Sequence, residues 1–279
     1  MAYQRILTIQ DISCVGQCSL TVALPILSAC GHETAALPTA VLSTHTGRFQ
    51  GYTFRDLTDD IPGIQAHWER EGLDFSAVYT GYLASARQIA LVRDVIRSRL
   101  RPGGVLIVDP AMADDGRLYS GFGTDVVDAM RMLCAGADYL LPNVTEAALL
   151  AGMDYREEFD RAYAERLAAG AAASARQTVI LTGVGFEPGK TGFLLWKDGE
   201  SSYYAHEKSA CGGYGTGDVF AAAFTGALLS GIGTEQAARI AAEYTGRCAA
   251  RTAQDPAHWY GLEFEPELSW LIRRLEERE

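Results

Sequence analysis

Short apolar runs alternate with longer amphipathic stretches along most of the chain. Apolar runs bounded by glycine or polar residues are typical of strands buried inside a parallel sheet. The longer stretches carry apolar residues on one face, as helices that cover a sheet require. This alternation predicts an α/β fold. The predicted strands are 5–9, 34–38, 77–80, 105–108, 139–141 and 178–181, and the predicted helices are 20–29, 88–100, 160–173, 219–229, 235–251 and 266–278.

The pattern changes after residue 183. Residues 191–196 and 201–205 read as two strands on either side of a polar turn, Lys-Asp-Gly-Glu at 197–200, which predicts a hairpin. The mostly parallel sheet should therefore end in an antiparallel edge. Because the chain contains no low-complexity linker, internal repeat or change of composition, we predict one domain over residues 1–279.

Composition narrows the range of partners. The 279 residues are 48% hydrophobic and 21% charged, which predicts a globular protein with a substantial core. The net charge of -11 makes nucleic acid and anionic membranes poor partners, because both attract basic surfaces. The N-terminus lacks the apolar core of a signal peptide and no later run reaches membrane-spanning length, so we expect a cytoplasmic location. The six cysteines form no Cys-x-x-Cys pair, which favours reduced thiols.

A glycine-rich turn before the predicted helix 219–229 carries the strongest chemical signal. It reads Gly212-Gly213-Tyr214-Gly215-Thr216-Gly217-Asp218. Such a turn leaves backbone N–H groups unpaired at a helix N-terminus, where the helix dipole also favours an anion. Asp218 would then lie where it can take a proton from a hydroxyl that attacks a bound phosphate. The turn predicts phosphoryl transfer to an alcohol, although an acidic residue in a first turn is also ordinary dipole compensation.

Polar and glycine residues follow the predicted strands. Ligands of open α/β sheets bind beyond the carboxyl ends of the parallel strands, so these positions should gather at one site together with the glycine turn. They are Asp11, Gly81-Tyr82, Asp109-Pro110, Pro142-Asn143 and Thr182-Gly183.

Six ordered segments resemble the pyridoxal kinase family, the vitamin B6 kinase branch of the ribokinase-like superfamily. Only Ser-x-His-Thr-Gly and Gly-Thr-Gly-Asp are moderately specific alone, but the order of all six is hard to reach by chance. The resemblance implies a single-domain ribokinase-like fold, a three-layer αβα sandwich. The segments are Ile9-Gln10-Asp11 with Gly16, Ser43-Thr44-His45-Thr46-Gly47, Thr80-Gly81-Tyr82-Leu83, Asp109-Pro110-Ala111-Met112, Pro142-Asn143-Val144-Thr145-Glu146 and Gly215-Thr216-Gly217-Asp218.

The resemblance implies roles at the glycine turn. Asp218 would be the base that activates the 5′-hydroxymethyl group of a B6 vitamer. The amides of Gly215, Thr216 and Gly217 would stabilise charge on the transferring phosphoryl group. The alternative for Asp218 is a carboxylate that caps its helix.

The resemblance also implies a nucleotide side. Asp109, Asn143 and Glu146 would organise Mg²⁺ and the ATP phosphates directly or through water, with Asp109 and Glu146 as the metal ligands. Their alternative is a loop or capping role, for which Pro142-Asn143 is suited. Further along the chain, Thr182 and Gly183 would line the nucleotide or be structural, and Asp114 and Tyr119 would belong to a mobile flap or to a plain polar loop.

On the substrate side, His45, Thr46 and Tyr82 would line the pocket for the pyridine ring by stacking and hydrogen bonding, although a lone histidine is often a packing residue. Asp11 stands where pyridoxal kinases commonly carry serine, and the loop that follows is one residue shorter. A carboxylate there could pair with a protonated ring nitrogen or an amine. We hypothesise that Asp11 takes part in substrate recognition and favours pyridoxamine.

The implied cofactors are ATP and Mg²⁺, with K⁺ as an optional monovalent cation, and the implied assembly is a homodimer. Cys211 lies near the glycine turn and is a candidate for the pocket wall. Two other functions stay open at this point. One is a kinase of the same superfamily that acts on hydroxymethylpyrimidine or a sugar, and the other is a non-catalytic vitamin-binding protein.

Overall fold

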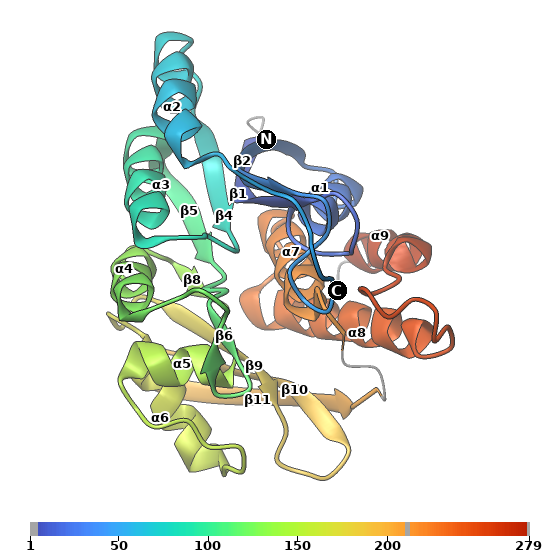
Figure 1. Ribbon diagram of the computed structural model, residues 1–279. Helices are drawn as coiled ribbons and strands as arrows, with labels where there is room; N and C mark the ends of the chain where they lie inside the picture. Colours follow the sequence, from blue (N-terminus) through green and yellow to red (C-terminus); the bar gives the residue numbers. More distant parts are fainter. Residues whose placement is uncertain (1–4, 210–212, 278–279) are drawn as a thin grey trace. The chain divides into compact units, whose positions relative to one another are not determined.

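The computed structural model of the chain describes residues 5–209 and 213–277, so Cys211 lies outside the described residues. The described residues form two compact units (Figure 1). Unit 1 contains those of Met1–Leu57 and His206–Glu279, and unit 2 contains Thr58–Ala205. No helix in the described ranges combines the length and the apolar content that crossing a bilayer requires.

Unit 1 has three strands in the order β1-β2-β3. β1 (Arg5–Ser13) pairs in parallel with β2 (Glu33–Leu42), and β2 pairs antiparallel with β3 (Phe54–Asp56). Ile6, Leu7 and Ile9 of β1 are fully buried, as expected for a strand covered on both faces. Its helices are α1 (Leu20–Ala29), α7 (Thr216–Leu229), α8 (Thr234–Thr252) and α9 (Leu268–Glu276), with a 3-10 turn at Glu265–Glu267.

α7 packs against both α1 and α8 (Figure 1). Its buried face carries a run of small residues, 221–223, and Gly226, which allow the neighbouring helices to approach closely. A Cβ atom at Gly226 would collide with the Sγ atom of Cys30, so this position has no room for a side chain. The small residues after the glycine turn therefore fix the N-terminus of α7 against the rest of unit 1.

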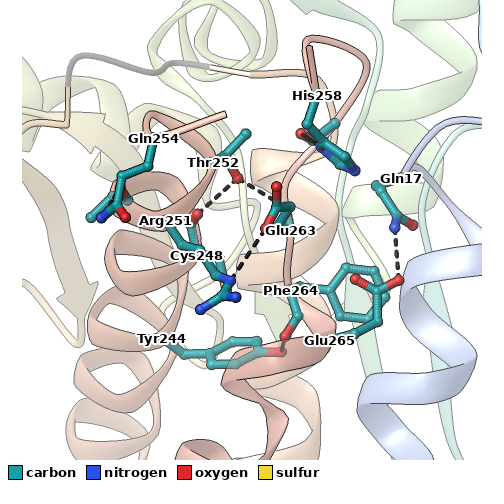
Figure 2. Close-up of polar contacts among 12 residues, drawn as sticks. Gln17, Tyr244, Cys248, Arg251, Thr252, Gln254, His258, Glu263, Phe264 and Glu265 are labelled. Atoms are coloured by element: carbon teal, nitrogen blue, oxygen red, sulfur yellow. Dashed lines mark hydrogen bonds and ion pairs between the residues drawn. The ribbon is translucent and has the colours of Figure 1, made fainter. Parts of the chain in front are cut away.

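The segment after α8 forms hydrogen bonds with that helix and with the loop before α1 (Figure 2). The Tyr244 hydroxyl donates to the carbonyl of Phe264 at 2.9 Å, and the Thr252 hydroxyl accepts from the N–H of Glu263 at 2.8 Å. Farther along, the Gln17 side chain donates to the Glu265 carboxylate at 2.7 Å. The first two contacts join the segment to α8, and the third joins it to the loop that contains Gln17.

Unit 2 has six strands in the order β11-β10-β9-β8-β5-β4. β4 (Phe75–Thr80), β5 (Leu100–Val108), β8 (Tyr139–Leu140) and β9 (Thr178–Val184) are parallel, and β10 (Lys190–Lys197) runs antiparallel to β9. β11 (Glu200–Glu207) follows β10 through the turn Asp198-Gly199, where both residues have positive φ as a two-residue hairpin turn requires. The helices of unit 2 are α2 (Ile61–Arg70), α3 (Ala86–Arg99), α4 (Thr124–Cys134), α5 (Val144–Ala151) and α6 (Arg161–Ala171), with a 3-10 turn at Thr58–Asp60 and a separate hairpin of β6 (Ala113–Asp114) and β7 (Arg117–Leu118).

Every predicted strand and helix is present, and the mostly parallel strands with an antiparallel C-terminal edge are confirmed. Several strands extend further than predicted, and two of them contain predicted site residues. Asp11 lies inside β1, at a register shift between Gln10 and Ile12, and Thr182-Gly183 lies inside β9. Both strands continue because their neighbours offer pairing partners beyond the apolar run, which the sequence pattern did not reveal. The prediction missed α2, α4 and the short strands β3, β6 and β7, and it gave no bounds for the helix that opens after Pro142-Asn143, while the single domain stays a prediction.

Candidate active site

The glycine turn begins α7 three residues earlier than predicted. Gly215 is the N-cap, with a φ of 77°, and a Cβ atom there would collide with the carbonyl oxygen of Gln17. The Thr216 hydroxyl and N–H both donate to the carbonyl of Gly213, at 2.6 Å and 3.4 Å. The N–H groups of Gly217 and Asp218 belong to the first turn, whose N–H groups have no acceptor inside a helix. The turn therefore presents an N-terminal anion site in which Gly217 is exposed.

Asp218 lies in the first turn of α7, as predicted, and is half-buried. The backbone N–H of Ser19, the residue before α1, lowers the pKa of its carboxyl group, but burial has the larger effect. Burial raises the pKa of Asp218 to about 7, and repulsion from Asp11 adds to the rise. A carboxylate with a pKa near neutrality is suited to accept a proton at physiological pH.

Asp11 is a second carboxylate in the same neighbourhood. It is 4% exposed, and the hydroxyl group of Ser13 donates to it at 3.0 Å. Burial raises the pKa of Asp11, and the hydroxyl groups of Ser19 and Ser13 oppose this rise. Burial raises the pKa of the Cys18 thiol well above its usual value, and repulsion from Asp218 and Asp11 adds to this rise. Cys18 is therefore a neutral thiol at physiological pH.

His45 is 5% exposed, and both of its ring nitrogens are used by the backbone. Nδ1 accepts from the N–H of Gly47 at 3.0 Å, so Nε2 carries the proton and donates to the carbonyl of Tyr260 at 2.9 Å. Burial lowers the pKa of the ring. Both ring nitrogens of His45 therefore already have backbone partners, and neither is left for the expected hydrogen bond to a substrate. This arrangement fits the alternative interpretation, in which His45 is a packing residue. Thr46, the next residue, is exposed.

Aromatic rings surround His45 in unit 1. Tyr214 and Phe49 lie 4.8 Å and 5.0 Å from it between ring centroids, and Trp259 lies 4.7 Å from Phe49. A Cβ atom at Gly47 would collide with the Tyr214 ring, which explains glycine at the end of the Ser-Thr-His-Thr-Gly segment. These rings provide apolar surfaces of the kind on which a flat heteroaromatic ligand can stack.

In unit 2, Asn143 and Glu146 form a capping box at the start of α5. The Asn143 side chain accepts from the N–H of Glu146 at 2.9 Å, and the Glu146 carboxylate accepts from the N–H groups of Asn143 and Met112 at 2.9 Å and 3.1 Å. The amide nitrogen of Asn143 also donates to the carbonyl of Ala113 at 2.8 Å. Burial raises the pKa of Glu146 to about 8 despite these donors. The capping role left open by the sequence is thus present for both residues.

Asp114 and Tyr119 belong to the β6–β7 hairpin and its exit. The turn of this hairpin is Asp115-Gly116, with φ values of 47° and 73°. The N–H of Gly116 donates to the Thr145 hydroxyl of α5 at 3.0 Å. Burial raises the pKa of Asp114, which accepts from the N–H of Asp115 at 3.0 Å. The predicted flap is therefore a short hairpin hydrogen-bonded to α5.

Tyr82 lies among aromatic rings of unit 2. Its ring stacks on Phe122 at 5.5 Å between centroids and lies 6.4 Å from Tyr119, which is itself 6.2 Å from Phe122. Tyr119 is 37% exposed. The sequence predicted Tyr82 and Tyr119 as separate substrate and nucleotide residues, whereas these rings share one cluster in unit 2.

Asp109, Thr182 and Gly183 lie at or near strand ends of unit 2. Asp109 follows β5, is 8% exposed, and its N–H donates to the carbonyl of Thr80 at 2.9 Å. Thr182 forms a parallel bridge with Asn143, and its N–H donates to the carbonyl of Pro142 at 2.9 Å. Gly183 has a φ of 72° at the bulge between β9 and β10, and its exposed Cα faces open space. The positive φ, and not crowding, is what favours glycine there.

The metal-binding prediction can be compared with these contacts. Among the described residues, no group of three or more histidine, cysteine or acidic side chains could hold a metal ion. One backbone N–H donates to each oxygen of the Glu146 carboxylate, and these two bonds leave lone pairs on both oxygens, so its role as a Mg²⁺ ligand stays a prediction. Asp109 offers a carboxylate beside the β5 terminus, and Mg²⁺ in phosphotransferases often needs only one or two carboxylates because phosphates and waters supply the rest. The residues thus fit a Mg²⁺ that arrives with a nucleotide and is held through Asp109.

Three residues of these clusters were missed from the sequence. Ser19 lowers the pKa of both carboxyl groups of unit 1, Tyr214 packs on His45, and Phe122 stacks on Tyr82. Tyr214 could have been found because it stands inside the glycine turn. Phe122 and Ser19 carry no comparable local signal, since their contacts come from distant parts of the chain.

Comparisons with known proteins agree with the resemblance. The family model described as phosphomethylpyrimidine kinase matches residues 24–261. A pyridoxine/pyridoxal/pyridoxamine kinase of Bordetella avium is 29% identical, over 94% of this chain and 93% of the relative.

Two solved structures cover nearly the whole chain. Pyridoxal kinase from Lactobacillus plantarum is 31% identical with a TM-score of 0.91, covering 99% of each chain. A putative phosphomethylpyrimidine kinase from Bacteroides thetaiotaomicron, crystallised with pyridoxal, is 33% identical with a TM-score of 0.86, covering 99% of this chain and 97% of that one. The fold is ribokinase-like, with a mostly parallel sheet flanked by helices. The matched span and these similarities show that the chain belongs to the phosphomethylpyrimidine kinase family, among whose members are pyridoxal kinases.

Proposed function

We propose that the protein is a pyridoxal kinase, which transfers the γ-phosphoryl group of ATP to the 5′-hydroxymethyl group of a B6 vitamer. The single observation that carries the mechanism is Asp218, whose pKa is raised to about 7 in the first turn of α7, beside N–H groups without intrahelical acceptors. Its relatives named as pyridoxal kinases support the substrate class.

The reaction follows from the chemistry of unit 1. Asp218 takes the proton of the acceptor hydroxyl, and the freed oxygen forms a bond to the γ-phosphorus of ATP. The bond from that phosphorus to the β–γ bridging oxygen breaks, and ADP leaves. The N-terminal amides around Gly217 stabilise the negative charge of the transferring group, together with the dipole of α7. Because the carboxylate of Asp218 is the conjugate base of an acid with a pKa near 7, it is available without a strong base.

The aromatic rings around His45 form the proposed acceptor surface in unit 1. Tyr214 and Phe49 offer faces for the pyridine ring, and His45 holds the loop through its two backbone contacts. Thr46 is exposed and available to a ligand. The substrate role of Tyr82, which stacks on Phe122 in unit 2, is proposed from the sequence.

We propose that residues of unit 2 bind the nucleotide. Asp109 would hold Mg²⁺ directly or through water, and Mg²⁺ supplies charge neutralisation of the phosphates. Asn143 and Glu146 keep α5 and the Met112 backbone in place through the capping box. Thr182 and Gly183 would line the nucleotide, and Asp114 and Tyr119 would cover it from the hairpin. ATP and Mg²⁺ are the proposed cofactors, with K⁺ as an optional addition.

A substrate panel tests this function. Purified protein is supplied with ATP, with and without Mg²⁺, and with pyridoxal, pyridoxine, pyridoxamine, hydroxymethylpyrimidine or ribose, and ADP release is measured with a coupled assay. We expect Mg²⁺-dependent release with the B6 vitamers above all others. The family description keeps hydroxymethylpyrimidine as the competing acceptor. Faster turnover of hydroxymethylpyrimidine would replace the proposal, and turnover of no alcohol would favour a non-catalytic vitamin-binding protein.

The raised pKa of Asp218 predicts the pH dependence of the reaction. Because the base works only when ionised, kcat/KM for pyridoxal should rise with pH up to about 7 and then level off. Asp11→Asn removes the negative charge that helps to raise the pKa of Asp218. The rise of kcat/KM with pH, which is the acidic limb of the pH profile, should therefore move to lower pH. The measurement is kcat/KM across the pH range for both proteins. An unmoved limb, or one moved to higher pH, would show that Asp11 does not act on the base.

The same Asp11→Asn variant tests substrate recognition. We propose that the Asp11 carboxylate pairs with a protonated ring nitrogen or amine and so favours pyridoxamine. The amide of the variant cannot form an ion pair, so the ratio of kcat/KM for pyridoxamine to that for pyridoxine should fall. Asp11→Ser, which restores the residue common in pyridoxal kinases, should give the same change. Unchanged ratios in both variants would remove Asp11 from recognition.

We also propose a homodimer. β3 ends the strand order of unit 1, and it carries Phe54, 46% exposed, near the exposed Tyr52 and Val15. An exposed edge strand with apolar side chains offers a surface for association. Light scattering during gel filtration should give twice the mass of the chain, whereas a single chain mass would contradict the dimer. The cytoplasmic location stays a prediction from the sequence.

A further inference from the structure

The loop with the proposed acceptor surface lies against a distant part of unit 1. The two partners are the acceptor loop, residues 45–49, and the supporting segment, residues 258–261, which follows α8. The Nε2 atom of His45 donates to the carbonyl of Tyr260 at 2.9 Å, although these residues are 215 positions apart in the chain. A hydrogen bond to the backbone of the supporting segment therefore fixes the start of the acceptor loop.

Trp259 makes the second connection between the two. Its ring lies 4.7 Å from the ring of Phe49 between centroids, and the guanidinium carbon of Arg48 lies 5.5 Å from the centre of the Trp259 ring. The first distance is typical of attractive aromatic pairs, and the second is that of a cation–π contact. Trp259 thus contacts two neighbouring side chains of the acceptor loop at once.

Much of the Trp259 ring is not part of the core. The residue is 41% exposed, and its ring and cation contacts among the described residues are with Phe49, Arg48 and the adjacent Tyr260. Single exposed apolar residues are common on protein surfaces. Trp259 differs from them because two of the three residues it contacts belong to the acceptor loop. Replacing it should therefore affect this loop more than the stability of the fold.

The supporting segment is itself held in place. A Cβ atom at Gly261 would lie 2.5 Å from the Cβ atom of Gln17, so the segment passes close to the loop before α1. The Nδ1 atom of His258 and the carbonyl oxygen of Gly261 are 3.1 Å apart, within hydrogen-bond distance. On either side, Thr252 and Tyr244 bond the following chain to α8 (Figure 2). The segment therefore offers a fixed support for the acceptor loop.

The ring contacts continue from the acceptor loop to the glycine turn. Tyr214 of that turn lies 4.8 Å from His45, and His45 lies 5.0 Å from Phe49, between ring centroids. With Trp259 beside Phe49, four rings stand in one row, each in contact with the next. The position of Phe49 therefore depends on His45 on one side and on Trp259 on the other.

We propose that Trp259 is a positioning residue for the B6 vitamer, holding Phe49 and the acceptor loop where they receive the pyridine ring. The inference rests on the proposed function, because the vitamer is the proposed acceptor. A loop without this support must be ordered when the ligand binds, and that ordering lowers affinity. The effect should be limited to the acceptor, since Asp218 and the N–H groups of α7 belong to another element.

Trp259→Leu tests this role. Leucine keeps an apolar side chain, but it can neither stack on Phe49 nor present a ring face to Arg48. We expect KM for pyridoxal to rise about tenfold, as the loss of an aromatic pair together with an exposed cation–π contact commonly gives. kcat and KM for ATP should stay unchanged, because the lost contact acts equally before and during the reaction. Steady-state kinetics with each substrate varied in turn measures these values, and titration calorimetry with pyridoxal alone should show the same loss of affinity.

Two further variants separate positioning from a general effect on packing. Trp259→Phe keeps a ring that can stack on Phe49, so its KM for pyridoxal should lie between those of the parent and of Trp259→Leu. Trp270→Leu is the matched control in α9. The Trp270 ring stacks on Tyr244 at 6.4 Å between centroids, and the guanidinium carbon of Arg247 lies 5.2 Å from its centre, but neither partner belongs to the acceptor loop. This control should keep the parental KM for pyridoxal.

The outcomes distinguish the inference from the function on which it rests. A raised KM for pyridoxal with parental kcat in Trp259→Leu, smaller in Trp259→Phe and absent in Trp270→Leu, supports the positioning role. A parental KM in Trp259→Leu, an equal rise in Trp270→Leu, or a fall in kcat alone would overturn it and leave the kinase proposal intact. If the parent protein phosphorylates no vitamer, the proposed function itself fails.

Discussion

Asp218→Ala is expected to lower kcat for pyridoxal by about 10³-fold, within the range of 10² to 10⁴ that a positioned general base supplies. The carboxylate is the proposed proton acceptor, and alanine leaves only the amides of the α7 N-terminus to act on the phosphoryl group. Nucleotide binding should persist, because removing a negative charge near the phosphates does not weaken the anion site. Steady-state turnover and the Kd for ADP, measured by calorimetry, check both parts.

Asp218→Asn is the companion variant. It preserves the shape of the side chain and an oxygen that can accept a hydrogen bond, but it cannot take a proton. It should therefore be as slow as the alanine variant and fold like the parent protein. Turnover within a factor of about three of the parent in the asparagine variant would exclude Asp218 as the base, since proton transfer contributes at least about 10²-fold.

Gly215→Ala is expected to have the second largest effect, on stability as well as activity. Alanine is strained at a φ of 77°, and its Cβ atom would collide with the carbonyl oxygen of Gln17. The backbone strain alone costs about 1–3 kcal/mol of unfolding free energy. The collision must also push the start of α7 away from the loop before α1, so we expect kcat to fall by about 10²-fold. Denaturant unfolding and turnover of the purified variant provide the two measurements.

Gly213→Ala is the matched control in the same turn. A Cβ atom there meets the Leu262 side chain at 3.5 Å, an ordinary contact. This variant should stay within about 1 kcal/mol of the parent in unfolding free energy, as substitutions without strain or burial changes commonly do. Equal losses in both variants would mean that the whole turn is sensitive and that Gly215 has no special role.

The fold was predictable where local patterns decide it. The apolar runs predicted the strands. The Asp198-Gly199 turn predicted the hairpin, because a two-residue hairpin turn needs positive φ at both residues. Strand ends were less predictable. β1 continues through Asp11 because β2 offers partners up to Leu42, and pairing between distant segments leaves little trace in the local pattern.

The candidate site was predictable as a set of residues but not as a set of contacts. The Gly-Thr-Gly-Asp segment led to the start of α7, and Asp218 has the raised pKa that its proposed role needs. By contrast, the sequence did not predict that both ring nitrogens of His45 form hydrogen bonds with the backbone. It also did not predict that backbone N–H groups donate to the Glu146 carboxylate.

Transfer of labelled phosphate tests the central claim most directly. The protein is incubated with γ-³²P-ATP, Mg²⁺ and pyridoxal, and the products are separated and identified by mass. We predict labelled pyridoxal 5′-phosphate in amounts equal to the ADP formed, and none with Asp218→Asn. Labelled inorganic phosphate without the vitamer phosphate, or equal transfer by Asp218→Asn, would contradict the account.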